Sequence, residues 1–335
     1  MINTNRKIIE CVPNFSEGQN ADIIDKIASS VQSTRNVKLL NVEPDRDYNR
    51  TVITFAGEPL YVKEAAFKAI STASELIDMS QQKGEHPRIG ATDVCPMIPV
   101  ANITKDECSK LSSELGKDVG EKLGIPVYLY EDAARSAERR NLENIRKGEY
   151  EGLEQKLKDW VPDYGPAEYN EKVRKSGATV IGTRFFLIAY NVNLNSRNVN
   201  IANEIAKKVR ESGSITIDET GTKKRVPGLL KNVKAIGVEL NEHNITQVSL
   251  NLTNYKETSM HEVFESIKAQ AKVHGIEATG SEVIGLAPKE ALLEAGAFYT
   301  SNNSEANLVE KAIEHLGLSQ LNTFEPEKKI IENLL

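Results

Sequence analysis

Cysteine is scarce in this sequence, and long apolar runs are absent. Its 335 residues include only Cys11, Cys95 and Cys108, an odd and sparse set that argues against a disulfide framework. No apolar stretch approaches the length of a membrane span, and the N-terminus lacks the apolar run of a signal peptide. We therefore expect a cytoplasmic protein.

A basic charge excess is also missing. The formal net charge of -6 gives no support to nucleic acid as a partner, because phosphate binding needs a basic face. A local basic pocket is still compatible with this charge. The five histidines include no pair with metal-ligand spacing, so we expect no metal site.

The length of the chain and the order of its apolar segments predict the fold class. Two domains are the natural expectation for 335 residues. The first block has the order strand, helix, strand, strand, helix, strand, which is the split βαβ pattern. Its expected segments are 7–12, a helix around 23–31, 37–42, 51–56, 60–79 and 94–100. A helix over 105–123 and a strand over 126–130 extend it.

The second block repeats this order. Residues 133–159 are charged and helical in character, and the prolines and glycine of 160–166 then mark a linker or a ligand-facing loop. The expected segments that follow are strand 178–193, helix 199–211, strands 233–240 and 245–252, helix 259–274 and strand 281–286. We expect an α/β (α+β) protein with two ferredoxin-like subdomains, 1–178 and 179–335, and a ligand groove between them.

The stretch from Gly84 to Gly90 holds the best candidate for catalysis. His86 precedes a proline, which disfavours helical geometry and holds the histidine extended. Glycines flank it on both sides, and Arg88 adds a permanent cation. A lone histidine is more often an ordinary surface or structural residue, so the local pattern alone leaves both interpretations open.

Motifs along nearly the whole chain resemble one family. They are 10–18 (ECVPNFSEG), 49–51 (NRT), 76–80 (LIDMS), 84–100, 126–130 (PVYLY), 146–151 (RKGEYE), 177–180 (GATV), 247–252 (QVSLNL), 285–288 (GLAP) and 329–332 (KIIE). In this order they resemble the formiminotransferase domain family, which is also found fused to cyclodeaminase. The combination is far more specific than any single motif.

The resemblance implies a reaction and a set of site residues. The reaction is transfer of a formimidoyl group from N-formimidoyl-L-glutamate to tetrahydrofolate in histidine degradation, by a homodimer with a basic tunnel between its subdomains. The catalytic residue of the family motif falls on His86. The implied folate contacts are Gly165, Pro166, Ala167, Ser176 and Gly177, with a second group at Lys208, Val209 and Arg210. Because the transferase portion is not followed by a cyclodeaminase, release of ammonia is expected to fall to a separate protein.

The chemistry of this reaction suggests further residues. One group of near-neutral pKa can move both protons, and histidine has that pKa. The carboxylates of the substrates call for arginines, for which Arg50, Arg88, Arg184 and Arg210 are the candidates. Asn49 accompanies Arg50, and Glu43 could orient the imidazole, although a solvated turn explains that acidic cluster equally well. Two alternatives stay open at this point, a formyl donor giving 5-formyltetrahydrofolate and a folate-binding protein without turnover.

Overall fold

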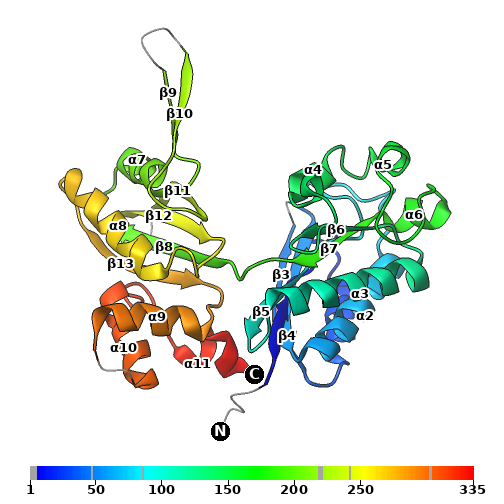
Figure 1. The fold of residues 1–335 in the computed structure, drawn as a ribbon, viewed down its shortest axis with the longest axis horizontal. Coiled ribbons are helices and arrows are strands. Elements are labelled where there is room, and N and C mark those ends of the chain that lie inside the picture. Colours follow the sequence, from blue (N-terminus) through cyan, green and yellow to red (C-terminus); the bar gives the residue numbers. More distant parts are fainter. Residues whose placement is uncertain (1–5, 47, 85–86, 218–221, 241–242, 302–303) are drawn as a thin grey trace. The chain divides into compact units, whose positions relative to one another are not determined.

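The chain forms two compact units, seen here in a computed structural model that describes residues 6–46, 48–84, 87–217, 222–240, 243–301 and 304–335. The first unit extends to Phe185, and the second runs from Phe186 to Leu334. Figure 1 shows the two units, coloured along the chain from blue at the N-terminus to red at the C-terminus.

The first unit contains one mixed sheet. Its strands are β1 (Ile8–Cys11), β2 (Asn14–Phe15), β3 (Val37–Asp45), β4 (Arg50–Gly57), β5 (Thr92–Ala101), β6 (Val127–Glu131) and β7 (Thr179–Thr183). β1 and β2 lie between β4 and β5 and are antiparallel to both, while β3 borders β4. This is the strand order of the split βαβ pattern, so the expected topology is confirmed. β7 and β6 then add parallel strands beyond β5.

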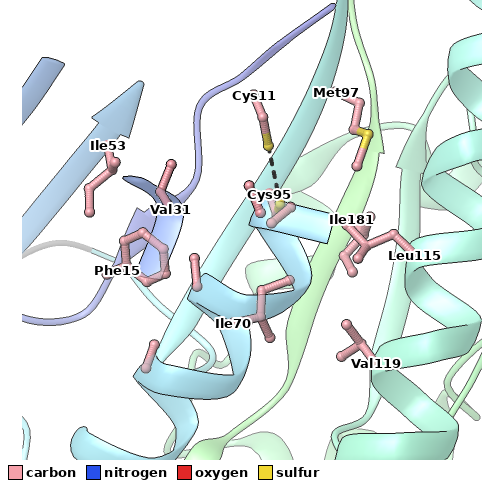
Figure 2. Packing of buried hydrophobic residues seen from close by; sticks show 14 of the residues in the cluster. Cys11, Phe15, Val31, Ile53, Ile70, Cys95, Met97, Leu115, Val119 and Ile181 are labelled. Carbon is pink, nitrogen blue, oxygen red and sulfur yellow. Dashed lines mark hydrogen bonds between the residues drawn. The ribbon is translucent and has the colours of Figure 1, made fainter. Parts of the chain in front are cut away.

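Three long helices cover one face of this sheet. They are α1 (Ala21–Gln32), α2 (Pro59–Leu76) and α3 (Lys105–Leu123). The sequence sets the ends of α3, because Thr104 and Glu107 form a capping box and Gly124 adopts a left-handed φ of 59°. Figure 2 shows the core between these helices and the sheet, including Phe15, Ile70 and Leu115.

Short helical segments cover the β5–β7–β6 part of the opposite face. These are a 3₁₀ turn at Ala137–Arg139, α4 (Leu142–Arg146), α5 (Leu153–Asp159) and α6 (Glu171–Ser176). They enclose a second core around Tyr128, Leu157 and Val180. The expectation of helical character throughout 133–159 is wrong between α4 and α5, where Gly148 and Glu149 have φ values of 86° and 52°. Those left-handed conformations end a helix.

The second unit repeats the topology. Its strands β8 (Ile188–Leu194), β11 (Val233–Leu240), β12 (Ile245–Leu252) and β13 (Ala278–Ile284) form an antiparallel sheet in the order β11-β12-β8-β13. Helices α7 (Val199–Val209) and α8 (Met260–Val273) pack on it. The other elements are the hairpin β9 (Ser214–Ile217) and β10 (Lys223–Val226), α9 (Lys289–Tyr299), α10 (Glu305–Leu316), α11 (Pro326–Lys329) and a 3₁₀ turn at Ile331–Leu334.

One expected strand is wrong. Residues 178–193 are not continuous: β7 belongs to the sheet of the first unit and β8 to that of the second. The apolar residues between them, including buried Phe186, lie where the chain passes from one unit to the other. An apolar run alone cannot distinguish a strand from such a crossing. The expected boundary after residue 178 therefore falls before β7, whereas the first unit extends beyond β7 to Phe185.

Membrane-spanning helices are not found in the described part of the chain, since none of its helices combines the necessary length with apolar character.

Candidate active site

The segment around residues 84–90 is held on its N-terminal side by the turn before β4. His86, the expected catalytic residue, and its neighbour Glu85 lie outside the described residues. The side-chain amide of Asn49 donates to the Lys83 carbonyl at 2.7 Å, and its oxygen accepts from the Gly18 amide at 2.9 Å. A Cβ on Gly84 would come within 2.5 Å of the Tyr48 carbonyl oxygen. Only glycine fits this close approach.

The C-terminal side of the same segment is held by Arg88, which is only 6% exposed. Its guanidinium donates to Glu151 at 3.0 and 2.8 Å, to Glu149 at 3.1 Å, and to the side chain and carbonyl of Gln82 at 2.8 and 3.4 Å. These five bonds equal the donor capacity of an arginine. The bond from Arg88 lowers the pKa of Glu151. A substrate carboxylate would have to displace one of these acceptors, so the contacts favour a positioning role for Arg88.

Backbone bonds continue this anchoring into β5. The Arg88 carbonyl accepts from the Tyr150 amide at 2.8 Å, and the Ile89 carbonyl accepts from the Ala178 amide at 2.9 Å. The Ile89 amide also donates to the carboxylate of Asp93 at 3.0 Å. Asp93 is buried and pairs with Arg146. Burial raises the pKa of Asp93, and Arg146 opposes that rise.

Two cavities border this region. One of about 630 Å³ is lined by Lys83, Gly84, Arg88, Gly148, Glu149 and Glu151. The ammonium of Lys83 makes no ion pair with a residue in the described ranges. The second cavity, of about 660 Å³, is lined by carboxylates and amides together with three apolar residues, namely Glu17, Gln19, Asn20, Ala21, Asp22, Asn49, Leu76, Ile77, Asp78, Gln81 and Gln82. The first cavity therefore lies beside the stretch that the sequence singled out, and the second approaches it only as far as Gln82.

The other expected substrate contacts are dispersed over the first sheet. Half-buried Arg50 donates from Nη1 to the Asn14 side chain at 3.1 Å. Glu43 is exposed on β3 and accepts from Asn41 at 2.6 Å. Arg184 follows β7, and its Nη1 donates to the Phe185 carbonyl at 3.1 Å. None of these contacts by itself assigns a substrate.

The sequence interpretation missed one buried carboxyl group, that of Glu10 on β1. Its side chain alternates with those of Ile9 and Cys11, which pack in the helix-covered core. Burial raises the pKa of Glu10 to about 7, although Arg184 opposes the rise. Glu10 can therefore exchange a proton near neutral pH.

The expected folate contacts of the first unit fall at two places. Gly177 has a φ of 66° and forms a bridge with Gly90, and the Ser176 carbonyl accepts from the Ala91 amide at 2.7 Å. These two residues thus adjoin the anchored segment. Gly165 has a φ of 82° and lies against Ile125, with Pro166 and Ala167 following it.

The remaining expected folate contacts belong to the second unit, at the end of α7. Val209 is buried and Lys208 is exposed. Arg210 donates to the carbonyls of Gly213 and Ala235 at 2.9 and 3.3 Å. Its guanidinium thus shapes the turn after α7.

Other reactive groups are few in the described ranges. These ranges contain no cluster of three or more His, Cys, Asp or Glu side chains suited to a metal ion. Cys11 and Cys95 are buried with their sulfur atoms 3.5 Å apart (Figure 2). Burial raises the pKa of the Cys11 thiol and leaves it a poor nucleophile.

Comparison with known proteins gives matches along the chain. The family described as "Formiminotransferase domain, N-terminal subdomain" matches residues 8–184, and "Formiminotransferase domain" matches residues 189–335. The chain is 45% identical to a formimidoyltransferase-cyclodeaminase of Dictyostelium discoideum, over 98% of this chain and 60% of that protein. It thus spans about 60% of the length of that bifunctional relative.

Shorter relatives match over almost their full length. A glutamate formimidoyltransferase of Streptococcus pyogenes serotype M1 is 41% identical over 98% of this chain and 99% of that protein. One of Thermoplasma acidophilum is 40% identical over 92% of this chain and 97% of that protein.

Proposed function

The chain belongs to the formiminotransferase domain family, and we propose that it transfers the formimidoyl group of N-formimidoyl-L-glutamate to tetrahydrofolate. The products would be 5-formimidoyltetrahydrofolate and L-glutamate. The observation that carries the proposal is the 41% identity to a glutamate formimidoyltransferase over 99% of that protein's length. The reaction belongs to histidine degradation and folate one-carbon metabolism.

In the proposed mechanism, the N5 amine of tetrahydrofolate attacks the amidine carbon of the donor. A new C–N bond forms, N5 gives up its proton, and the bond from carbon to the glutamate nitrogen breaks as that nitrogen gains a proton. His86 accepts the first proton and returns one to the leaving nitrogen. The contacts of Asn49 and Arg88 support this role, because they fix the chain on both sides of residues 85 and 86.

The donor carboxylates need cationic partners. Arg50 remains our candidate, and Lys83 joins it because it lines the cavity beside Gly84. Arg88 is assigned a positioning role instead, since its guanidinium is occupied by Glu149, Glu151 and Gln82. Glu43, Asn49 and Arg184 stay predictions as substrate contacts, and so do the folate contacts of 165–167, 176–177 and 208–210.

The proposal extends to the setting of the enzyme. A homodimer, a cytoplasmic location and a separate cyclodeaminase that consumes the product are parts of it. So is a ligand tunnel between the subdomains. Each of these follows from the resemblance or from composition and stays a prediction.

An assay of glutamate release tests the proposed reaction. Purified protein is supplied with tetrahydrofolate and either N-formimidoyl-L-glutamate or N-formyl-L-glutamate. We expect release from the formimidoyl donor. Release from the formyl donor alone would favour the formyl alternative, and release from neither would leave only a binding role.

A further inference from the structure

The second sheet carries a polar group of side chains on the face opposite α7 and α8. Tyr190, Val192 and Val248 alternate toward the helix-covered side and are buried there. Asn191 and Asn193 on β8 therefore point to the other face. In the register, Asn193 lies opposite Gln247 of β12, and Asn191 lies opposite Glu282 of β13. These four residues, called here the amide–carboxylate cluster, thus lie together.

Hydrogen bonds fix the geometry of this cluster. Gln247 donates to Asn193 at 2.7 Å and to Oε1 of Glu282 at 2.8 Å. Asn191 donates to the same Oε1 at 3.1 Å, and Asn193 donates to Gln320 at 2.7 Å. Asn193 and Gln247 are buried, whereas Asn191 and Glu282 are half-buried. The carboxylate of Glu282 is thus held in place through one oxygen.

Several acceptors in the cluster are left for a ligand. Oε2 of Glu282, Oε1 of Gln247 and Oδ1 of Asn191 receive no hydrogen bond from any residue that the structure describes. Glu282 also forms no ion pair with a lysine, arginine or histidine of those ranges. Each of these three oxygens is accessible to solvent, so a ligand can reach it. The arrangement therefore suits a ligand with adjacent N–H donors.

Apolar side chains flank the cluster on the same face. Ile284 lies two residues beyond Glu282 and is 50% exposed. Ile236, which is 56% exposed, lies two residues before Val238, the residue opposite Gln247. Exposed isoleucines beside a set of acceptors suit a flat ring that is polar at its edge and apolar on its faces.

We propose that the amide–carboxylate cluster binds the 2-amino-4-oxopyrimidine edge of the tetrahydropterin ring. The ring N3–H and the 2-amino group are adjacent donors, the 2-amino group for the free Oε2 of Glu282 and N3–H for a free amide oxygen of Asn191 or Gln247. The assignment rests on the proposed function, because it presumes tetrahydrofolate as co-substrate. It places pterin recognition at Glu282, Asn191 and Gln247, apart from the folate contacts expected from the sequence.

Glu282→Gln tests the proposal in the full chain, because it keeps the side-chain shape and replaces an acceptor by a donor. Calorimetric titration compares tetrahydrofolate with its 2-deamino analogue. Loss of the amino group should weaken binding to the wild-type protein by about tenfold, the value of one charge-assisted hydrogen bond. The variant should bind tetrahydrofolate about tenfold more weakly and lose its preference for the amino group. Glu239→Gln is the matched control, since Glu239 is exposed on β11.

Two results would overturn the inference. One is a Glu282→Gln variant that still prefers tetrahydrofolate over the 2-deamino analogue. The other is a variant that weakens both ligands equally, which indicates a structural role. Glutamate release by the wild-type protein is measured in parallel. If the wild type releases glutamate, either of these results overturns only the pterin-binding inference and leaves the proposed function in place. A wild-type protein that neither binds tetrahydrofolate nor releases glutamate would overturn both.

Discussion

The buried carboxyl group of Glu10 has a pKa raised to about 7 from an ordinary value of 4.5, because burial disfavours its ionised form. The folded state therefore holds this proton over a pH range in which the unfolded chain releases it. Stability contributed by the protonated group is complete below about pH 4.5 and is lost as pH rises through 7. Glu10 is thus a source of pH-dependent stability within the first unit.

Replacing Glu10 by Gln should remove this dependence. We expect the variant to match the wild-type free energy of unfolding at pH 4 and to exceed it at pH 8, by up to about 3 kcal/mol. Urea unfolding at both pH values measures the difference. Glu138→Gln, at an exposed position, serves as the control. A Glu10→Gln variant that loses stability at pH 8 would show that the ionised carboxylate is stabilising.

Arg50 tests the recognition of the donor. Arg50→Lys keeps the charge but removes the planar fork of donors. We expect the KM for N-formimidoyl-L-glutamate to rise about tenfold, the cost of one charge-assisted contact, with little change in the KM for tetrahydrofolate. Arg46→Lys, in the same turn and exposed, is the control. Equal increases in the two KM values would indicate a structural role for Arg50. No increase in either would exclude contact with the substrate.

The site could be predicted from sequence only in part. The motif around Gly84 indicated where to look, and the anchored flanks of that stretch support its importance. Arg88 was expected to meet substrate because a guanidinium suits carboxylates. Its partners Glu149 and Glu151 lie 61 and 63 residues away in sequence, so local spacing could not reveal that the chain supplies its own carboxylates. Glu10 was missed because burial follows from tertiary packing.

At the scale of elements, the contacts of Arg88 join residues 82–88 to the loop between α4 and α5. Arg88→Lys removes most of these bonds from a buried position. We expect a loss of about 2–4 kcal/mol in the free energy of unfolding. As a positioning residue, Arg88 should affect kcat by tenfold or more while both KM values stay within about twofold. Arg174→Lys, which makes the same change at a surface pair with the exposed Glu171, serves as the control.

A rise in the KM for the donor alone would contradict this assignment. That result would return Arg88 to the substrate-binding role that the sequence suggested. Steady-state kinetics and urea unfolding on the same preparations make the comparison.

Local signals predicted some elements well. α3, β11 and β12 have the expected limits, because capping and alternation are encoded in neighbouring residues. The predictions failed over 133–159 and 178–193. Over 133–159, residues in the left-handed conformation interrupt the helices. Over 178–193, one apolar run contributes strands to two different sheets. Both outcomes depend on contacts with distant parts of the chain.

At the scale of the whole molecule, the chain contains two units with the same strand order. The second has its own antiparallel sheet and its own helices. A fragment of residues 186–335 should therefore fold alone and unfold cooperatively on heating. Circular dichroism during a thermal scan measures this. A fragment without a cooperative transition would show that the second unit depends on the first.

The central claim is that this chain releases glutamate from N-formimidoyl-L-glutamate through a proton transfer by His86. The most direct measurement is kcat for that release by the wild-type protein and by His86→Ala, with tetrahydrofolate saturating. We predict turnover by the wild type and a loss of roughly 10²-fold or more in the variant, at an unchanged unfolding midpoint. A near-normal kcat for His86→Ala, or a wild-type protein that releases no glutamate, would contradict the account.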